Sequence, residues 1–376
     1  MEVELVCNDC GRVLQIDKPT AGQVILCPGC GAAVSALRTA ISTEAPQEPA
    51  ADVTPVGQLY RKIRSEVGKV FVGQEELVQG TLVALLSGGH VLIESVPGLG
   101  KTLLVRTLGK VLGCRFTRIQ FTPDLMPSDI TGTPVFDMKS QEFRFRPGPV
   151  FTQLLLADEI NRSPAKTHAA LLEIMQEFRV TVDGVSHPLE RPFLVLATEN
   201  PVETEGTYHL PEAQLDRFMF KLVVDYPDEE EERRILWLHA RRDEIFEGLD
   251  EKVQPVTSPQ ELLETMRRVS RVWIAPAVVD YINSLVRATR RWPAFFMGAS
   301  PRAGIALLCG ARTLAAFHGR NFVLPDDVRE LALPALRHRV ILTPEAEVEG
   351  ITVDRALREL LDSVEVPRLE APALPS

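Results

Sequence analysis

Four cysteines near the amino terminus have the spacing of metal ligands. Cys7, Cys10, Cys27 and Cys30 form a C-x2-C-x16-C-x2-C pattern, and a glycine follows each pair. A gap of two residues lets both thiolates of a pair bind one metal ion, and four thiolates close a tetrahedral Zn²⁺ site with no open position for water. The pattern therefore predicts a structural zinc ribbon, which we favour over two disulfides in a chain that we do not expect to be exported.

A second candidate site is the loop that follows a short apolar strand at 90–94. Its last residues, Gly100, Lys101 and Thr102, match the end of the phosphate-loop pattern G-x-x-x-x-G-K-[ST], although Ser95 replaces the first glycine. A lysine at a helix start opposes the helix dipole unless an anion binds there. The loop predicts a nucleotide site in which Lys101 reaches the phosphates and Thr102 binds Mg²⁺. Its expected residues are Val96, Pro97, Gly98, Leu99, Gly100, Lys101, Thr102 and Leu103.

Two more apolar strands end in polar residues. The run 154–157 leads into Asp158 and Glu159. In a phosphate-loop enzyme the first acid would hold Mg²⁺ and the second would polarise the attacking water. The run 193–198 leads into Glu199 and Asn200, whose amide could hold that water. Taken alone, the acid pair could be a strand leaving the core, and Asn200 could be a turn residue before proline.

The elements that must position these residues divide the chain into five parts. A zinc ribbon at 1–37 is followed by a proline-bearing linker at 38–55. Strand-like runs alternate with amphipathic helices over 56–226, the α/β signature of a parallel sheet. Residues 227–345 have the pattern of an all-helical lid, and 346–376 are expected to form a C-terminal tail.

The net charge narrows the choice of partner. The 376 residues carry a formal net charge of −10, which disfavours a protein that grips nucleic acid through phosphate contacts. No run of about 18 apolar residues occurs, so we expect no membrane span. Residues 1–4 show no basic leader, and we expect a cytoplasmic protein.

Several motifs together resemble the MoxR family of AAA+ ATPases over about residues 57–345. The motifs appear in the family's order along the chain. They are VGQ at 72–74, VPGLGKT at 96–102, LADEINR at 156–162, ATENP at 197–201, LPEAQLDRF at 210–218 and GASPRA at 298–303. The family usually has Gln where this chain has Glu199.

This resemblance implies a fold and an activity. The fold would be an AAA+ parallel-sheet domain with a helical lid, and the activity would be hydrolysis of the β–γ phosphoanhydride of ATP with Mg²⁺. Gln74 would bind the nucleotide and Asn200 would be the sensor 1 residue. Arg217 would be the arginine finger, acting on the neighbouring subunit of a ring, and Arg302 would be the catalytic, nucleotide-contacting sensor 2 residue. Ser300 and Pro301 support a helix start just before Arg302. The alternative for either arginine is a surface ion pair.

Two inserts also resemble the branch of ring ATPases that contains this family. Residues 180–185 alternate around Asp183 and Gly184, a type I′ hairpin signal. Residues 131–149 resemble the insert within the second helix and contain the alternating run FRFR at 143–146. In related rings such hairpins project toward the pore. The alternative is an edge hairpin with one packed face.

The resemblance also implies partners. A homohexameric ring would perform chaperone-like remodelling, activation or cofactor insertion on a protein client, often one with a von Willebrand factor A domain. Two alternatives stay open. One is a nucleic-acid-remodelling motor of the same branch, which the acidic charge disfavours. The other is a nucleotide-switched scaffold without catalysis.

Overall fold

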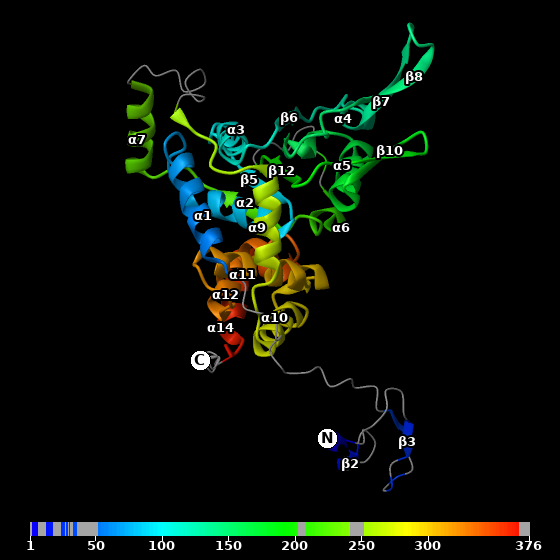
Figure 1. Cartoon of the computed structure of the whole chain (residues 1–376). Coiled ribbons are helices and arrows are strands. Elements are labelled where there is room, and N and C mark those ends of the chain that lie inside the picture. Colours follow the sequence, from blue (N-terminus) through cyan, green and yellow to red (C-terminus); the bar gives the residue numbers. More distant parts are fainter. Residues whose placement is uncertain are drawn as a thin grey trace. The chain divides into compact units, whose positions relative to one another are not determined.

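The chain divides into two compact units, Met1–Pro49 and Ala50–Ser376. The computed structural model describes, in the first unit, residues 2–6, 13–17, 24–26 and 33–35 with Pro28 and Cys30. In the second unit it describes residues 52–201, 208, 210–240 and 252–367. Figure 1 shows the chain coloured along its sequence.

The first unit contains two antiparallel hairpins. Strand β1 (Glu2–Val6) pairs with β2 (Val13–Asp17), and β3 (Val24–Leu26) pairs with β4 (Ala33–Ser35). Each C-x2-C pair lies in the connection of one hairpin. Of the four predicted zinc ligands, Cys7, Cys10 and Cys27 lie outside the described residues, and Cys30 is exposed.

A five-stranded sheet forms the centre of the second unit, as the alternation of strands and helices predicted. Its order is β13–β5–β12–β9–β6, and every neighbouring pair is parallel. The bounds are β5 Val91–Ser95, β6 Phe116–Gln120, β9 Leu154–Asp158, β12 Leu194–Glu199 and β13 Phe220–Val224. The three central strands β5, β12 and β9 are apolar and buried on both faces, as is typical of parallel sheets, whereas the edge strand β6 is partly exposed.

Strands β5, β9 and β12 send alternate side chains into two separate cores. On β12, Leu194 and Leu196 pack with helices α1 (Thr54–Val67), α2 (Glu75–Ser87) and α3 (Lys101–Leu112). Val195 and Ala197 face the other core, with α4 (Pro127–Thr131) and α5 (Ala165–Glu177). The two-residue period of a strand therefore builds a three-layer arrangement with the sheet in the middle.

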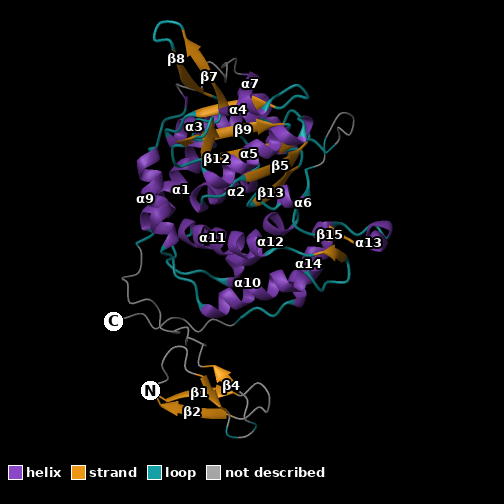
Figure 2. Ribbon diagram, turned by 90° about the vertical axis from the view of Figure 1, so that its right-hand side faces the viewer, coloured by secondary structure: helices purple, strands orange, loops and turns teal. Residues whose placement is uncertain are grey.

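The lid is mostly helical, and in Figure 2 most of its helices lie together below the sheet. Its helices are α9 (Pro259–Ser270), α10 (Pro276–Thr289), α11 (Pro301–Phe317), α12 (Pro325–Leu336), α13 (Pro344–Val348) and α14 (Val353–Ser363). A short antiparallel pair, β14 (Phe295–Met297) with β15 (Ile341–Leu342), interrupts the expected all-helical pattern. Helix α6 (Glu212–Leu215) precedes the segment 227–345 that was predicted as the lid, and α7 (Glu229–Ala240) lies at the start of that segment.

Two expected domain boundaries differ from the structure. Helix α1 begins at Thr54, inside the stretch predicted as linker, because Pro55 favours the first helical turn and Val53 is buried. The predicted tail at 346–376 contains α14, which contacts α10 and α12 and buries Leu357 and Leu360 completely. Burial of that apolar stripe makes α14 part of the lid core.

Both inserts form hairpins that leave the body of the domain. Strand β7 (Gly132–Asp137) pairs with β8 (Glu142–Pro147), and β10 (Arg179–Val182) pairs with β11 (Val185–Pro188). Asp183 and Gly184 have φ of 49° and 77°, as the predicted type I′ turn requires. Figures 1 and 2 both show β7–β8 projecting from the domain. Phe145 of β8 stacks on His187 of β11 with ring centroids 4.0 Å apart, so the two hairpins are in contact.

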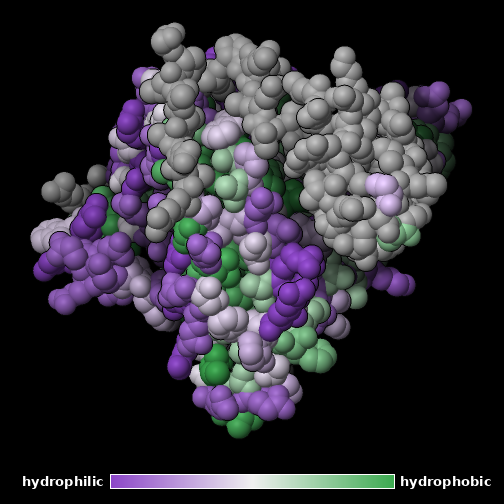
Figure 3. All heavy atoms as spheres, turned by 90° about the horizontal axis from the view of Figure 1, so that it is seen from below, coloured by the Kyte–Doolittle hydropathy of each residue, from purple (hydrophilic) through white to green (hydrophobic). Residues whose placement is uncertain are grey.

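The described surface is mixed in polarity. On the face seen in Figure 3, hydrophilic and hydrophobic residues are interspersed among the coloured atoms. Within the described ranges, no helix is both long and apolar enough to cross a bilayer.

His90, directly before β5, contacts both helix α5 and the neighbouring strand β12. One ring nitrogen, Nε2, lies 3.0 Å from the carbonyl oxygen of Met175 on α5. The other, Nδ1, accepts from the backbone N–H of Val195 at 3.1 Å, which assigns the proton to Nε2. Burial, and to a smaller extent the charge of Arg191, lower the pKa of His90 to about 4, although the hydrogen bond to the carbonyl of Met175 opposes this shift. In the folded protein the imidazole ring of His90 is therefore neutral near pH 7.

This histidine makes stability depend on pH. Because its pKa is lower in the folded chain than in the unfolded one, protonation favours unfolding and stability falls as pH drops below about 6.5. Between pH 7 and pH 5 we expect His90 to remove about 2 kcal/mol from the free energy of unfolding. Denaturant titrations at both pH values should show a smaller loss for His90→Asn than for the parent chain. An equal loss in both proteins would contradict this role.

Candidate active site

Three neighbouring strands end side by side at one edge of the sheet. Strands β5, β12 and β9 end at Ser95, Glu199 and Asp158. Because the strands are parallel, the residues that follow them lie at the same edge. In the register of β12, Glu199 lies opposite Glu94 of β5. The phosphate loop, Asn200 and the acid pair therefore meet here, as their positions after three strands predicted.

The phosphate loop turns through two left-handed glycines. Gly98 and Gly100 have φ of 87° and 72°, a region that favours glycine, and Gly100 is followed directly by α3. Lys101 at the first position of α3 donates from Nζ to the Ser95 hydroxyl at 2.7 Å. The residue that departs from the loop pattern thus gives the lysine a partner. Burial lowers the pKa of Lys101, while the carboxylates of Asp158 and Glu159 oppose that shift.

Asp158 is held from two sides. The hydroxyl of Thr198, on β12, donates to Oδ1 at 2.6 Å, and Arg118, on β6, donates from Nη2 to Oδ2 at 2.7 Å. The same threonine oxygen accepts from the backbone N–H of Glu159 at 2.8 Å. One buried hydroxyl therefore fixes both acids to the end of the neighbouring strand.

Glu159 occupies a left-handed position with φ of 55° directly after β9. Its Oε2 accepts from the side-chain amide of Gln120 at 2.8 Å and from Arg162 at 3.0 Å. Its side chain is about a quarter exposed, so the carboxylate borders solvent. A carboxylate held in this way can accept a proton from a water molecule at the sheet edge.

Thr102 and Asp158 supply the oxygen ligands that Mg²⁺ prefers. Oδ2 of Asp158 accepts from both Nε and Nη2 of Arg118, at 3.1 and 2.7 Å. Oδ1 keeps a second lone pair after its bond to Thr198, so water or a metal ion can still bind there. The donor set fits Mg²⁺ held together with phosphate oxygens. Among the described residues, no group of three or more His, Cys, Asp or Glu side chains is placed to hold a metal by itself.

The glutamate at position 199, where the resembled family usually has Gln, is explained by the ion pairs around it. Lys221 of β13 lies 2.8 Å from a Glu199 oxygen and 2.6 Å from Glu94. Burial raises the pKa of Glu199, and the lysine opposes this shift. Burial also disfavours the charge on Lys221, but the two carboxylates together raise its pKa. The acid that departs from the family pattern is therefore part of a buried ion cluster behind the phosphate loop.

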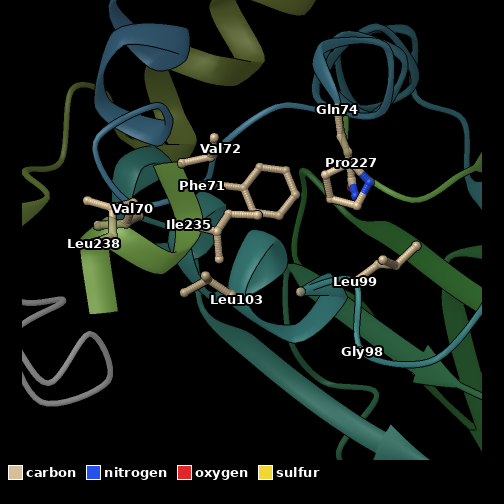
Figure 4. Close-up of a pocket in the computed structure, with 11 residues that line it drawn as sticks. Val70, Phe71, Val72, Gln74, Gly98, Leu99, Leu103, Pro227, Ile235 and Leu238 are labelled. Atoms are coloured by element: carbon tan, nitrogen blue, oxygen red, sulfur yellow. The ribbon is translucent and has the colours of Figure 1, made fainter. Parts of the chain in front are cut away.

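A cavity of about 230 Å³ lies beside the phosphate loop. Apolar side chains from the segment before α2, from the loop and α3, and from α7 form most of its lining. Figure 4 shows Phe71 at the centre, with Leu103 and Ile235 on one side and Gln74 and Pro227 on the other. Its shape and lining suit a flat heteroaromatic ring next to the phosphate site.

Gln74 is the polar side chain in this lining. It stands in the left-handed position before α2, with φ of 53°, and its amide oxygen is buried without a hydrogen-bond donor among the described residues. An unpaired buried acceptor costs free energy, so a ligand that donates a hydrogen bond there would be favoured.

The three remaining candidate residues, Asn200, Arg302 and Arg217, lie in three different environments. Asn200 is buried directly after β12. Arg302 lies in the first turn of α11, after the Ser300 cap that the sequence predicted. Its guanidinium donates to Gln176 of α5 at 2.8 and 3.0 Å when the Gln176 amide is oriented with its oxygen toward it. Arg217 follows α6, is partly exposed, and forms no ion pair within the described residues.

Sequence reasoning missed the residues that hold the two acids. Arg118 and Gln120 lie two apart on β6, which places them on the same face of a strand. That spacing was visible in the sequence, but their role depends on β6 lying next to β9, which spacing does not show. Thr198 was included only as the end of a strand.

Two family profiles match the chain. The profile described as "ATPase family associated with various cellular activities (AAA)" matches residues 90–220, and one described as "AAA lid domain" matches residues 287–360. The first covers the sheet edge from the phosphate loop to β13. The second includes α14, in agreement with its packing in the lid.

Several relatives align over most of the chain. An uncharacterised protein, YeaC of Bacillus subtilis, is 46% identical over 82% of this chain and 95% of its own length. Chaperone MoxR1 of Mycobacterium tuberculosis is 44% identical over 81% of this chain and 82% of its own. Protein MoxR of Methylorubrum extorquens is 31% identical over 81% and 94%. The crystal structure of a proposed ATPase from Cytophaga hutchinsonii superposes with a TM-score of 0.78 at 42% identity, covering 84% of this chain and 97% of that one.

Proposed function

Because the chain belongs to the MoxR family of AAA+ ATPases, we propose that it hydrolyses the β–γ phosphoanhydride of ATP with Mg²⁺. The observation that carries the proposal is the convergence of Lys101, Asp158, Glu159 and Asn200 at one edge of the sheet. A nucleotide-switched scaffold would need the loop and the pocket, but not a restrained carboxylate beside solvent.

Lys101 would bind the phosphates when they replace its present partner. Its amine is held by the Ser95 hydroxyl, and burial lowers its pKa although the carboxylates of Asp158 and Glu159 oppose the shift. A triphosphate would supply several anionic oxygens and stabilise the charged amine. Thr102 and Asp158 would bind Mg²⁺, which neutralises charge on the phosphates.

Glu159 would accept a proton from the attacking water. Gln120 and Arg162 restrain one of its oxygens and leave lone pairs on the other. Asn200 would orient that water, and Arg302 would contact the γ-phosphate after release from Gln176. Arg217, partly exposed and without an ion pair within the described residues, would reach the nucleotide of a neighbouring subunit and stabilise charge in the transition state. This arrangement calls for a ring, which we propose to be a homohexamer.

The cavity beside the loop would hold the adenine ring. The 6-amino group of adenine is a donor, and the buried amide oxygen of Gln74 is an acceptor that lacks one. Guanine has a carbonyl oxygen at that position, so it would leave the Gln74 oxygen unpaired. The pocket therefore favours ATP over GTP.

The client would be a protein. The net charge of −10 disfavours nucleic acid, and a relative carries the name of a chaperone. The β7–β8 hairpin offers exposed Met138 and Phe143, 83% and 73% accessible, which suit contact with an apolar polypeptide segment. We propose remodelling, activation or cofactor insertion in a client, with von Willebrand factor A domain proteins as first candidates. Stimulation of ATP turnover by DNA or RNA would favour the nucleic-acid motor instead.

The first unit would be a zinc ribbon. Both C-x2-C pairs lie in the connections of β-hairpins, the position from which four thiolates can reach one Zn²⁺. Such a site lacks an open coordination position, so the metal would stabilise the fold of the ribbon. The separate unit is suited to recruiting a partner, while the ATPase site lies wholly within the second unit.

The water-activating role of Glu159 predicts a separation of binding from hydrolysis. Glu159→Gln should bind ATP within about twofold of the parent affinity and lose at least ~100-fold in turnover, because the amide cannot take the proton. Equilibrium binding and steady-state phosphate release would measure the two. Glu190→Gln is the matched control, because Glu190 is exposed and pairs with Arg115 at the opposite end of the strands. Unchanged turnover in Glu159→Gln would refute the assignment.

The acceptor role of Gln74 predicts a change in base selectivity. Gln74→Met keeps the length of the side chain but lacks the amide, so ATP affinity should fall about fivefold while GTP affinity changes little. Competition between the two nucleotides for a fluorescent analogue would give the ratio. Leu99→Met alters the apolar lining alone and should preserve it. If the ratio is the same in both variants, Gln74 does not recognise the base.

The ribbon proposal predicts one zinc ion per chain. Elemental analysis of the purified protein should find it, and the double change Cys7→Ser with Cys10→Ser should remove it. Cys114→Ser is the control, because Cys114 is buried in the second unit, where burial raises its pKa to about 12. Deletion of residues 1–49 should leave basal ATP turnover within about twofold, because the unit boundary lies before α1. Zinc retained by the double variant would disprove the site.

A further inference from the structure

Asp216, the residue before Arg217, is contacted by residues at the ends of two lid helices. Its carboxylate accepts from the Ser300 hydroxyl at 3.0 and 2.9 Å and from Nε of Arg339 at 2.8 Å. Arg302 lies 4.0 Å away. Since Ser300 caps α11 and Arg339 follows α12, one acid joins the start of one lid helix and the end of another to the segment that carries Arg217.

Arg339 holds the backbone on both sides of Arg217. Its side chain is 3% exposed, and it donates to the carbonyl oxygens of Asp216 at 3.0 Å, Phe218 at 2.6 Å and Met219 at 3.0 Å. Burial lowers the pKa of Arg339, and Asp216 opposes the shift. A buried guanidinium that lost this acid would be left without its anion, which is costly. The segment 216–219 is therefore fixed to α12 by its own carbonyls and by one carboxylate.

Arg217 differs from every residue around it. Its neighbours are anchored, but its own side chain is partly exposed and forms no ion pair within the described residues. The anchored backbone restrains the position from which the Arg217 side chain extends. Ser300, on the same carboxylate, begins the turn that carries Arg302.

We propose that Asp216 is a positioning residue, which holds Arg217 in the orientation for the neighbouring subunit and ties that orientation to the lid through Ser300 and Arg339. The inference rests on the proposed function, in which Arg217 acts on the neighbour's nucleotide. It assigns to Asp216 a role in turnover that an ordinary bond between domain and lid would not have.

A double-mutant cycle tests this role. Asp216→Asn keeps the shape of the side chain and removes its charge, so kcat should fall about tenfold while KM for ATP stays within about twofold. In an Arg217→Ala background the same change should lower kcat less than about twofold, because the residue being positioned is absent. A further tenfold loss in that background would overturn the positioning role alone. Unchanged kcat in Arg217→Ala would instead refute the proposed finger, and the positioning role with it.

The lid provides a matched control. Asp327 is 3% exposed and pairs with Arg320 at 2.6 Å near the start of α12, whereas Arg339 lies beyond its end. Asp327→Asn removes a comparable buried charge and should lower the thermal midpoint as Asp216→Asn does. Its effect on kcat should be small and additive with Arg217→Ala. A non-additive loss with Asp327→Asn would attribute the effect to general loosening of the lid and overturn the proposal.

Ser300→Ala is the alternative test variant if Asp216→Asn does not fold. It removes a donor to Asp216 and the cap of α11, and its smaller loss of kcat should also vanish in the Arg217→Ala background. Thr352→Ala removes the equivalent cap of α14, which accepts from the Arg355 backbone, and controls for the cap itself. Additive behaviour of Ser300→Ala would count against the proposal.

Mixed assemblies give a readout that a folding defect cannot imitate. Asp216→Asn subunits keep an intact nucleotide site, and Lys101→Ala subunits keep an intact Asp216–Arg217 pair. At an interface between the two, one complete site forms, so ATP turnover of the mixture should exceed the sum of the separate proteins at least about threefold. Turnover equal to that sum would overturn the proposal.

Discussion

The parallel direction of the five strands is the constraint on which the site depends. Because every strand points the same way, the segments that leave β5, β9 and β12 share one edge, and residues far apart in sequence become neighbours. The same constraint requires helices on both faces, since parallel strands cannot leave a face to water. The two cores on either side of β12 are the result. Packing thus holds the strand ends in place, and the polar contacts act on positions that are already fixed.

Much of this could be predicted from the sequence, because the chemistry lies where local patterns are strong. Apolar runs ending in Asp158 and Asn200, and a glycine loop ending in Lys101, identify strand ends without knowledge of the strand order. The restraints on the acids could not be predicted. Arg118 and Gln120 act on Asp158 and Glu159 only because β6 and β9 are adjacent, and Lys221 reaches Glu199 across β5. These contacts are long-range, and single-sequence patterns report only what is local.

The domain boundaries also show that a single sequence reports only local patterns. The tail after residue 345 lacks a motif, and its helix α14 was not anticipated from composition. Its apolar stripe fits against α10 and α12, so tertiary packing decides that the helix belongs to the lid. The four N-terminal cysteines are the reverse case, because their spacing is distinctive in the sequence although three of the four lie outside the described residues.

The stacked rings of Phe145 and His187 give the two projecting hairpins a mechanical consequence. The β7–β8 hairpin is inserted before β9 and the β10–β11 hairpin before β12, so they are rooted at two adjacent strands of the sheet. Because these rings stack with their centroids 4.0 Å apart, each hairpin restrains the movement of the other. A force applied at the exposed tip of the β7–β8 hairpin would therefore be transmitted to the points where both hairpins join the domain. Both hairpins lead into the amino ends of β9 and β12, so a displacement of the hairpins would reach Glu159 and Asn200 only through the length of these two strands.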